Sequence, residues 1–424
     1  MDDPTPDADL DAMPSAMNDT VISSAATART GHLHLPFLDG IRAVAALWVL
    51  LGHCYLFAFG WQRSASPWGR LLDPLLYMHF GVDIFLVLSG FCLALPVVRH
   101  GDGLPVPLRD YFLARAWRIL PPYLMTLFLI LLVNAFVPLA GWGRHAAGLT
   151  GSIPAPVLLS NLFLLQDVFP GTNIINGPFW SIAVEWHLYF VFPLLVPVLR
   201  RRGPVGLFAF GTAAAAILTW LRFRYPVLSD AVPATIPEPP YYIALFAMGI
   251  VAAALAADPR YRPMGAVLHR RARGAACLSC LPLGAALWTY RIGDGGNVHR
   301  FFDHAHIIDP LAGAVTAACL LAMCGLAPRH PWRRFFESRF LVAVGGFSYS
   351  LYLVHIPLLA ALNRGIEHAG LPAHSAGSVF CVLVAAGVPG CLLFARAFAH
   401  AFERRYRRAA GRPAHEPARV HEGA

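Results

Sequence analysis

The sequence predicts an all-α membrane protein, one bundle of about ten transmembrane helices with both termini in the cytoplasm. Three observations lead to this fold class. The 424 residues are 57% hydrophobic and 13% charged, with a mean hydropathy of +0.55, whereas an average soluble domain is about 25% charged. Apolar runs of membrane-spanning length recur along the chain. All 33 basic residues are arginines, and they gather in alternate connections between these runs.

Each predicted span is an apolar run that approaches the roughly 20 residues needed to cross a bilayer core about 30 Å thick. The ten runs lie at about 41–60, 77–98, 119–139, 179–199, 205–221, 241–257, 275–290, 307–327, 341–361 and 377–399. Run 275–290 is short, but an even number of spans is required if both ends lie on one side. A further run at 155–166 is too short to span, so we expect it to lie in the interface or fold back into the protein.

The arginine distribution predicts the orientation of the bundle. With the N-terminus inside, the inner connections hold sixteen arginines and the outer connections eight, and the C-terminal tail adds more to the inside. This is the bias expected of cytoplasmic loops. We therefore predict a disordered cytoplasmic tail at 1–36, a transmembrane domain at 37–402 and a basic cytoplasmic tail at 403–424. The first tail lacks the basic-then-apolar order of a signal peptide.

The remaining composition excludes several classes of function. The net charge of +9 is explained by membrane orientation, so we expect no nucleic-acid partner. The eight cysteines fall in apolar runs, where they are best interpreted as small buried hydrophobes. Cys277 and Cys280 have no second Cys or His pair nearby, and we expect no metal site.

The first span carries two ionisable residues, Arg42 and His53. They are eleven positions apart, so at about 100° per residue both side chains lie on one helical face, about 16 Å apart along the axis. Ionisable residues inside a bilayer are costly and are candidates for function by default. The simpler alternative is that Arg42 contacts lipid phosphates and His53 makes a single interhelical hydrogen bond.

Three more ionisable residues are predicted to share the depth of His53. With a rise of about 1.5 Å per residue, Asp83, Glu185 and His355 all fall with His53 in one layer of the outer half of the membrane. Two carboxylates and two imidazoles at one depth suggest a buried site that handles protons. A carboxylate bonded to an imidazole would orient the ring and raise its basicity. The alternative is a set of scattered interhelical hydrogen bonds.

Arginines at the inner surface form a second candidate group. Arg115 and Arg118 are three residues apart on one helical face, where paired guanidinium groups suit phosphate recognition. Arg42 enters at the same surface, and anchoring to lipid headgroups is the alternative. Further candidate polar residues of the site are Trp180, Ser348 and Tyr349. Ser89 is not expected to be a nucleophile, because nothing in the sequence marks a base beside it.

Five motifs in order resemble the integral-membrane acyltransferase family 3, over about residues 38–401. They are LDGIRAVAALWVLLGH with Arg42 and His53, FGVDIFLVLSGF, RAWRILPPYL with Arg115 and Arg118, WSIAVEWHLYFVFPLL and SYSLYLVHIPLL. Members of this family O-acylate bacterial surface glycans and some secondary metabolites. The resemblance implies a ten-helix bundle, with His53 as the essential base, Arg42 as a second essential residue, and Arg115 and Arg118 at the coenzyme A end of the donor.

The resemblance therefore predicts a membrane O-acyltransferase of the bacterial inner membrane. It would move an acyl group, expected to be acetyl, from cytoplasmic acyl-CoA to a hydroxyl of a glycan or similar acceptor, with membrane lipids as its surroundings. The hydrolase-like C-terminal domain of some members is not expected here. Two other functions use similar residues. One is a proton-coupled transporter, although the two halves show no obvious repeat. The other is a non-catalytic subunit that handles glycans or lipids.

Overall fold

The structure, a computed structural model, confirms the predicted all-α class. It describes residues 35–61, 69–101, 103–136, 153–169, 171–224, 241–261, 264, 274, 280–289, 301–302, 304–369 and 375–403. All regular structure within these ranges is helical. The chain divides into two units, Met1–Pro36 and Phe37–Ala424. The predicted tails at 1–36 and 403–424 lie almost wholly outside the described residues.

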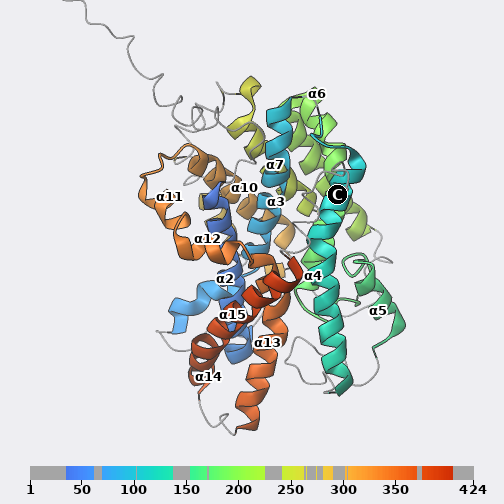
Figure 1. Ribbon diagram of the computed structural model, residues 1–424. Helices are drawn as coiled ribbons and strands as arrows, with labels where there is room; N and C mark the ends of the chain where they lie inside the picture. Colours follow the sequence, from blue (N-terminus) through green and yellow to red (C-terminus); the bar gives the residue numbers. More distant parts are fainter. Residues whose placement is uncertain are drawn as a thin grey trace, which may run out of the picture. The chain divides into compact units, whose positions relative to one another are not determined.

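The helices are labelled in Figure 1. The first half of the chain forms α2 (Pro36–Phe59), η1 (Gly69–Tyr77), α3 (Phe80–His100), α4 (Leu108–Phe136), α5 (Ala155–Leu162), α6 (Phe179–Arg224), α7 (Tyr242–Ala257) and η3 (Pro259–Tyr261). The second half forms α10 (Ala305–Cys324), α11 (Pro331–Phe336), α12 (Arg339–Gly345), α13 (Ser348–His368), α14 (Ala376–Val382), η5 (Leu383–Gly387), α15 (Val388–Phe398) and η6 (Ala399–Glu403).

Six of the described helices are long and apolar enough to cross a membrane. They are α2, α3, α4, α6, α10 and the continuous stretch from α14 to η6. The pair α12 and α13, bent by 75°, raises the number to seven if it counts as one broken span. Shorter apolar helices occur at Tyr242–Ala257 and Cys280–Thr289, within the predicted runs 241–257 and 275–290. The full count of ten and the sides of the termini remain predictions.

The long helix α6 corresponds to two predicted spans. A straight helix of 46 residues would be about 69 Å long at 1.5 Å per residue, more than twice the thickness of a bilayer core. Gly203 interrupts it with a φ of 69° and a ψ of −174°, a conformation that glycine adopts without steric cost. The two helical segments on either side of this kink contain the predicted runs 179–199 and 205–221.

Helix α4 begins eleven residues earlier than the run predicted at 119–139, at Leu108. Arg115 and Arg118 therefore lie on regular helix. The helix continues through Pro121 and Pro122, even though proline removes a backbone donor and usually bends a helix.

Helices α3, α7 and α10 pack against one another (Figure 1). Two glycines explain the close approach of α3 and α7. A Cβ atom on Gly90 would clash with the carbonyl of Phe246, and one on Gly249 would clash with the carbonyl of Val87. Small residues allow membrane helices to pack backbone to backbone in this way.

The short run predicted at 155–166 folds back against the bundle. It forms α5, whose eight residues are too few to span a membrane. The hydroxyl of Tyr123, on α4, donates to the backbone carbonyl of Asn161 at 2.7 Å. Gln166, just after α5, donates to the carbonyl of Phe179 at 2.8 Å. These bonds attach the segment to α4 and to the start of α6.

Candidate functional site

The structure brings His53 of α2 together with His355 of α13. The Nδ1 atom of His53 lies 3.2 Å from the Nε2 atom of His355, and the two rings meet edge to face with their centroids 4.8 Å apart. His355 is fully buried and His53 is half-buried. Two of the four residues predicted to share one depth are therefore in direct contact.

The neighbouring backbone carbonyls define the tautomers of the two rings. His355 Nδ1 is 2.8 Å from the carbonyl oxygen of Tyr352, so this nitrogen carries a proton and Nε2 is an acceptor. His53 Nδ1 is 2.8 Å from the carbonyl oxygen of Val49, so it too carries a proton, which it shares between Val49 and His355. In neutral His53 the lone pair then lies on Nε2. Such an imidazole can accept a proton at a defined atom.

Glu185, on α6, has different neighbours. Its Oε1 atom accepts hydrogen bonds from the hydroxyls of Ser89 at 3.0 Å and Tyr189 at 2.6 Å. The sequence marks no base beside Ser89, and on this point the structure differs, because a carboxylate lies at hydrogen-bond distance from its hydroxyl. Ser89 and Glu185 come from different helices 96 residues apart, so no local pattern reveals the contact.

Helix α13 links the histidine pair to the surroundings of Glu185. The backbone carbonyl of Tyr352 accepts the hydrogen bond from Nδ1 of His355. The side-chain hydroxyl of Tyr352 lies 2.8 Å from the hydroxyl of Ser181 on α6. Tyr352 also interacts electrostatically with Glu185. The two groups therefore belong to one region between α2, α3, α6 and α13.

Arg42 contacts the thiol of Cys92 on α3, and Arg118 lies within electrostatic range of the same thiol. One amino group of Arg42 lies 2.6 Å from a carboxylate oxygen of Asp39, and the other donates to the sulfur of Cys92 at 2.9 Å. The guanidinium of Arg118 interacts electrostatically with Cys92 and with the carboxylates of Glu185 and Glu403. Two of the three arginines predicted to act together thus share a neighbour.

Arg115 lies beside the same network. Its guanidinium carbon is 6.0 Å from the centre of the Tyr111 ring and 5.8 Å from that of Tyr189, distances that allow cation–π attraction. Among the described residues, its buried Nε atom has no hydrogen-bond partner. A buried donor without a partner is costly, and an oxygen of a bound anion would satisfy it. Arg115 can therefore take an anionic oxygen as a further partner.

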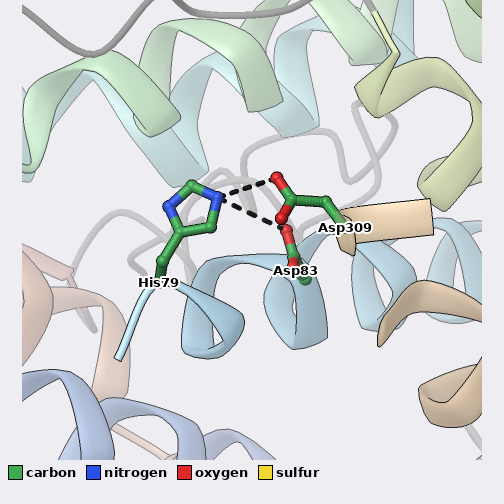
Figure 2. A group of neighbouring side chains, drawn as sticks. All are labelled: His79, Asp83 and Asp309. Carbon is green, nitrogen blue, oxygen red and sulfur yellow. Dashed lines mark hydrogen bonds and ion pairs between the residues drawn. The ribbon is translucent and has the colours of Figure 1, made fainter. Parts of the chain in front are cut away.

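Asp83 lies in a separate group with His79 and Asp309 (Figure 2). The Nε2 atom of His79 is 4.0 Å from Asp83 and 2.9 Å from Asp309. Trp180, another predicted site residue, stacks on the His79 ring with centroids 5.7 Å apart. The shared depth suggests Asp83 as a partner for His53, and Trp180 is a further candidate residue of the site. Depth in the membrane does not determine lateral neighbours, and in the structure both residues lie beside His79.

The sequence signals for this group are weak. His79 precedes Asp83 by one helical turn, and Asp309 stands near the start of the apolar run predicted at 307–327. A carboxylate in an apolar run is a signal by itself, but nothing in the sequence pairs it with a residue 230 positions earlier.

The last two candidates, Ser348 and Tyr349, lie at the start of α13. The Ser348 hydroxyl donates to the carbonyl of Gly345 at 2.9 Å, across the bend between α12 and α13. The Tyr349 hydroxyl donates to the carbonyl of Ile119 on α4 at 3.0 Å. Next to them, Ser350 donates to Glu403 at 2.7 Å, a contact that the sequence analysis missed. These bonds join α13 to α4 and η6 around the arginine group.

Comparisons with known proteins point in the same direction. A family profile described as an acyltransferase domain matches residues 35–396. The acyltransferase MdmB of Streptomyces mycarofaciens is 28% identical over 346 residues, covering 78% of this chain and 81% of the relative. Nodulation protein 10 of Rhizobium leguminosarum bv. viciae is 25% identical over 231 residues, which cover 52% of this chain and 59% of the relative.

A third relative is the putative peptidoglycan O-acetyltransferase YrhL of Bacillus subtilis (strain 168). It is 27% identical over 175 residues, which cover 39% of this chain and 24% of the relative. No solved structure matches the chain significantly.

Proposed function

Because the chain belongs to the acyltransferase family whose profile matches residues 35–396, we propose that it moves an acetyl group from cytoplasmic acetyl-CoA to a hydroxyl of a glycan or similar acceptor. Membership makes the chain an acyl-transferring membrane enzyme, which removes the grounds for a proton-coupled transporter or a non-catalytic subunit. Two relatives are named as putative O-acetyltransferases, and these names support acetyl as the group and a hydroxyl as the acceptor.

The proposed base is His53, and the contact with His355 is the observation that carries this proposal. The proton on His53 Nδ1 is shared with Val49 and His355, so Nε2 is the nitrogen with the lone pair. His355 is then a positioning residue, because it holds the ring and its tautomer without touching the substrate. Its own Nδ1 proton is held by the carbonyl of Tyr352.

The proposed reaction is a direct transfer. His53 Nε2 takes the proton of the acceptor hydroxyl, and the hydroxyl oxygen attacks the thioester carbonyl. The carbon–sulfur bond then breaks, and the sulfur of coenzyme A leaves with the proton that His53 accepted. General-base catalysis of this kind contributes about 10²–10⁴-fold, and holding the two substrates together contributes further.

Arg115, Arg118 and Arg42 are proposed to bind the phosphates of acetyl-CoA. Their neighbouring positions and the buried Nε of Arg115 support this role. One guanidinium group can donate hydrogen bonds to two oxygens of a phosphate at the same time. The axial distance of about 16 Å between Arg42 and His53 suits a donor whose phosphates lie at one end and whose thioester lies at the other.

Glu185 is proposed to orient the donor site through Arg118, with which it interacts electrostatically. Asp83 is left out of the reaction, because its described neighbours are His79 and Asp309. We further propose that the protein lies in the bacterial inner membrane with both termini in the cytoplasm, so that the arginines face the compartment that holds acetyl-CoA.

Activity of the purified full-length chain in lipid nanodiscs tests this function. The measurement follows release of the coenzyme A thiol from acetyl-CoA, with and without a panel of glycan and small hydroxyl acceptors, and transfer of radiolabelled acetyl to the acceptor. His53→Gln is expected to lower kcat by about 10²–10⁴-fold with an unchanged KM for acetyl-CoA. Full transfer by His53→Gln would exclude His53 as the base.

A further inference from the structure

We propose that His79, Asp83 and Asp309 bind a divalent transition-metal cation. His79 precedes the first turn of α3, Asp83 lies in that turn, and Asp309 lies in the first half of α10. Figure 2 shows the imidazole and both carboxylates pointing toward one another. One ligand atom from each residue can be chosen so that all three lie within 4.8 Å of one another.

The burial of the group calls for a compensating positive charge. Asp83 and Asp309 are completely buried and His79 is 7% exposed. Within the part of the chain that the structure describes, neither oxygen of Asp83 has a hydrogen-bond partner, and the same holds for Oδ1 of Asp309. Buried carboxylates that lack partners are strongly unfavourable, and in proteins such groups are paired or coordinate metals.

The distances between the ligand atoms fit a small cation. His79 Nε2 is 2.9 Å from Asp309 Oδ2 and 4.0 Å from Asp83 Oδ1. Zinc bonds of about 2.0–2.2 Å in a tetrahedral site place ligand atoms about 3.4 Å apart, and the two observed distances lie on either side of this value. All three ligand atoms lie within 4.8 Å of one another, so binding of one cation by all three requires side-chain rotations that draw Asp83 closer to His79.

The ligand types select the class of cation. An imidazole nitrogen with two carboxylate oxygens suits Zn²⁺, Mn²⁺ and similar ions, whereas Mg²⁺ and Ca²⁺ prefer oxygen ligands alone. Cysteine is absent from the three residues, which disfavours Cu⁺ and iron–sulfur chemistry.

Aromatic residues around the group provide the outer contacts that metal ligands usually have. The Tyr241 hydroxyl donates to Asp309 Oδ2 at 2.6 Å, which orients this carboxylate. Trp180 stacks on the ring of His79, and the Tyr242 hydroxyl, 3.4 Å from the ligand atom Nε2 of His79, turns away when a cation binds there. Such contacts hold ligands in place, and their loss typically weakens metal binding by about 10–100-fold.

A cation here would join three helices at one end of the bundle. Its ligands come from α3 and α10, and the tyrosine that orients Asp309 stands at the start of α7. These three helices already pack against one another. The proposed role is therefore to stabilise the fold, and it does not depend on the proposed reaction. The proposed site also departs from the sequence-based expectation of no metal site. That expectation was drawn from the spacing of the cysteines alone.

The rival explanation is that protons, rather than a metal ion, neutralise the two carboxylates. The two explanations differ in their response to Asp83→Asn, because asparagine imitates a protonated aspartic acid but is a poor metal ligand. If protons neutralise the group, this variant retains the stability of the wild type. If a cation does so, the variant loses the metal and the stability that the metal confers.

The test uses the full-length chain purified in detergent without chelators. Metal content is measured by inductively coupled plasma mass spectrometry, and Tm is measured before and after chelation and after addition of Zn²⁺, Mn²⁺ or Mg²⁺. We expect about one transition-metal ion per chain, a fall in Tm of about 3 °C or more on chelation, and recovery with Zn²⁺ or Mn²⁺ but not with Mg²⁺.

Variants locate the metal. Asp83→Asn and Asp309→Asn are expected to retain less than about a fifth of the metal, and Tyr241→Phe to bind Zn²⁺ about tenfold more weakly. Asp167→Asn is the matched control, because Asp167 forms a similar pair with His187 at 2.7 Å outside the group. If Asp309→Asn does not fold, the Zn²⁺ titrations of wild type and Tyr241→Phe still decide. The proposal would be overturned if the wild type contained no metal and its Tm did not change on addition of Zn²⁺ or Mn²⁺.

Discussion

At the scale of single residues, the chemistry depends on which atom of His53 can accept a proton. An isolated histidine in a membrane helix has two equivalent options. Here the carbonyl of Val49 and the Nε2 atom of His355 both face Nδ1, so one tautomer is favoured. This is the usual way in which a neighbour directs an imidazole, although the neighbour is a second histidine and not the carboxylate that the sequence suggests.

His355 is therefore expected to affect turnover rather than donor binding. His355→Leu removes one of the two acceptors of the His53 Nδ1 proton, and we expect kcat to fall about 10–100-fold with an unchanged KM for acetyl-CoA. His355→Gln, whose amide oxygen can accept the same hydrogen bond, should recover part of the loss. The measurement is steady-state acetyl transfer in nanodiscs.

The control for His355 is His187→Gln. His187 is paired with Asp167 and is partly exposed, so its loss should leave both kinetic constants unchanged. Equal kcat values for His355→Leu, His355→Gln and wild type would show that His53 does not need this neighbour.

Arg115 should act on donor binding. Arg115→Ala removes the buried Nε donor and one charged contact to phosphate, each of the order of 1.5–3 kcal/mol for hydrogen bonds to charged groups. We expect the KM for acetyl-CoA to rise about 10–100-fold with a smaller effect on kcat. Arg109→Ala, on the same helix but exposed, should leave KM unchanged. A KM of Arg115→Ala equal to that of wild type would argue against phosphate binding by this residue.

At the scale of helices, the fold depends on close contacts that only small residues permit. Gly90 and Gly249 allow α3 and α7 to touch through their backbones, and Gly90 directly follows Ser89, whose hydroxyl bonds Glu185. Gly203 has a different role, because its positive φ interrupts α6 and divides it into two helical segments. The same helices thus carry the site and determine which of its residues meet.

Substitution of Gly249 tests this packing. The Cβ of Gly249→Ala would clash with the backbone of α3, and we expect a loss of about 1–3 kcal/mol of stability, as for overpacked cores. Gly390→Ala is the matched control, because a Cβ at Gly390 meets no atom within 4 Å. Thermal denaturation in detergent should show a lower Tm for Gly249→Ala only. Equal Tm values would mean that α3 and α7 can separate at little cost.

At the scale of the whole molecule, the orientation in the membrane decides which substrate each end of the site meets. The structure shows six or seven membrane-spanning candidates, and the kink in α6 adds one segment to this number. The inference that arginine-rich connections face the cytoplasm places the arginine group on the side where acetyl-CoA is made.

Reporter fusions in a bacterial host test the orientation. A fluorescent protein that folds only in the cytoplasm, fused to either terminus, should be fluorescent, and alkaline phosphatase, which is active only after export, should be inactive at both ends. The reason is that an even number of spans returns the chain to its starting side. An active phosphatase at one terminus would mean an odd number of spans and would require a new topology.

The candidate residues could be singled out from the sequence because they are unusual in their own segments. Arg42, His53, Glu185 and His355 stand out in apolar runs, and the arginine pair follows helical spacing. His79, Asp309 and Cys92 were missed because they matter only through neighbours on other helices.

The sequence by itself determined the all-α membrane class and the family, since hydropathy and motif order are properties along the chain. It also predicts a depth for each polar residue from the rise per residue. The tertiary structure alone decided which residues meet at that depth. His53 pairs with a residue 302 positions away, and Asp83 lies with His79 and Asp309 instead. The physical reason is that lateral contact depends on the rotation and neighbours of each helix, and these follow from packing between helices, including the glycine contacts of α3 and α7.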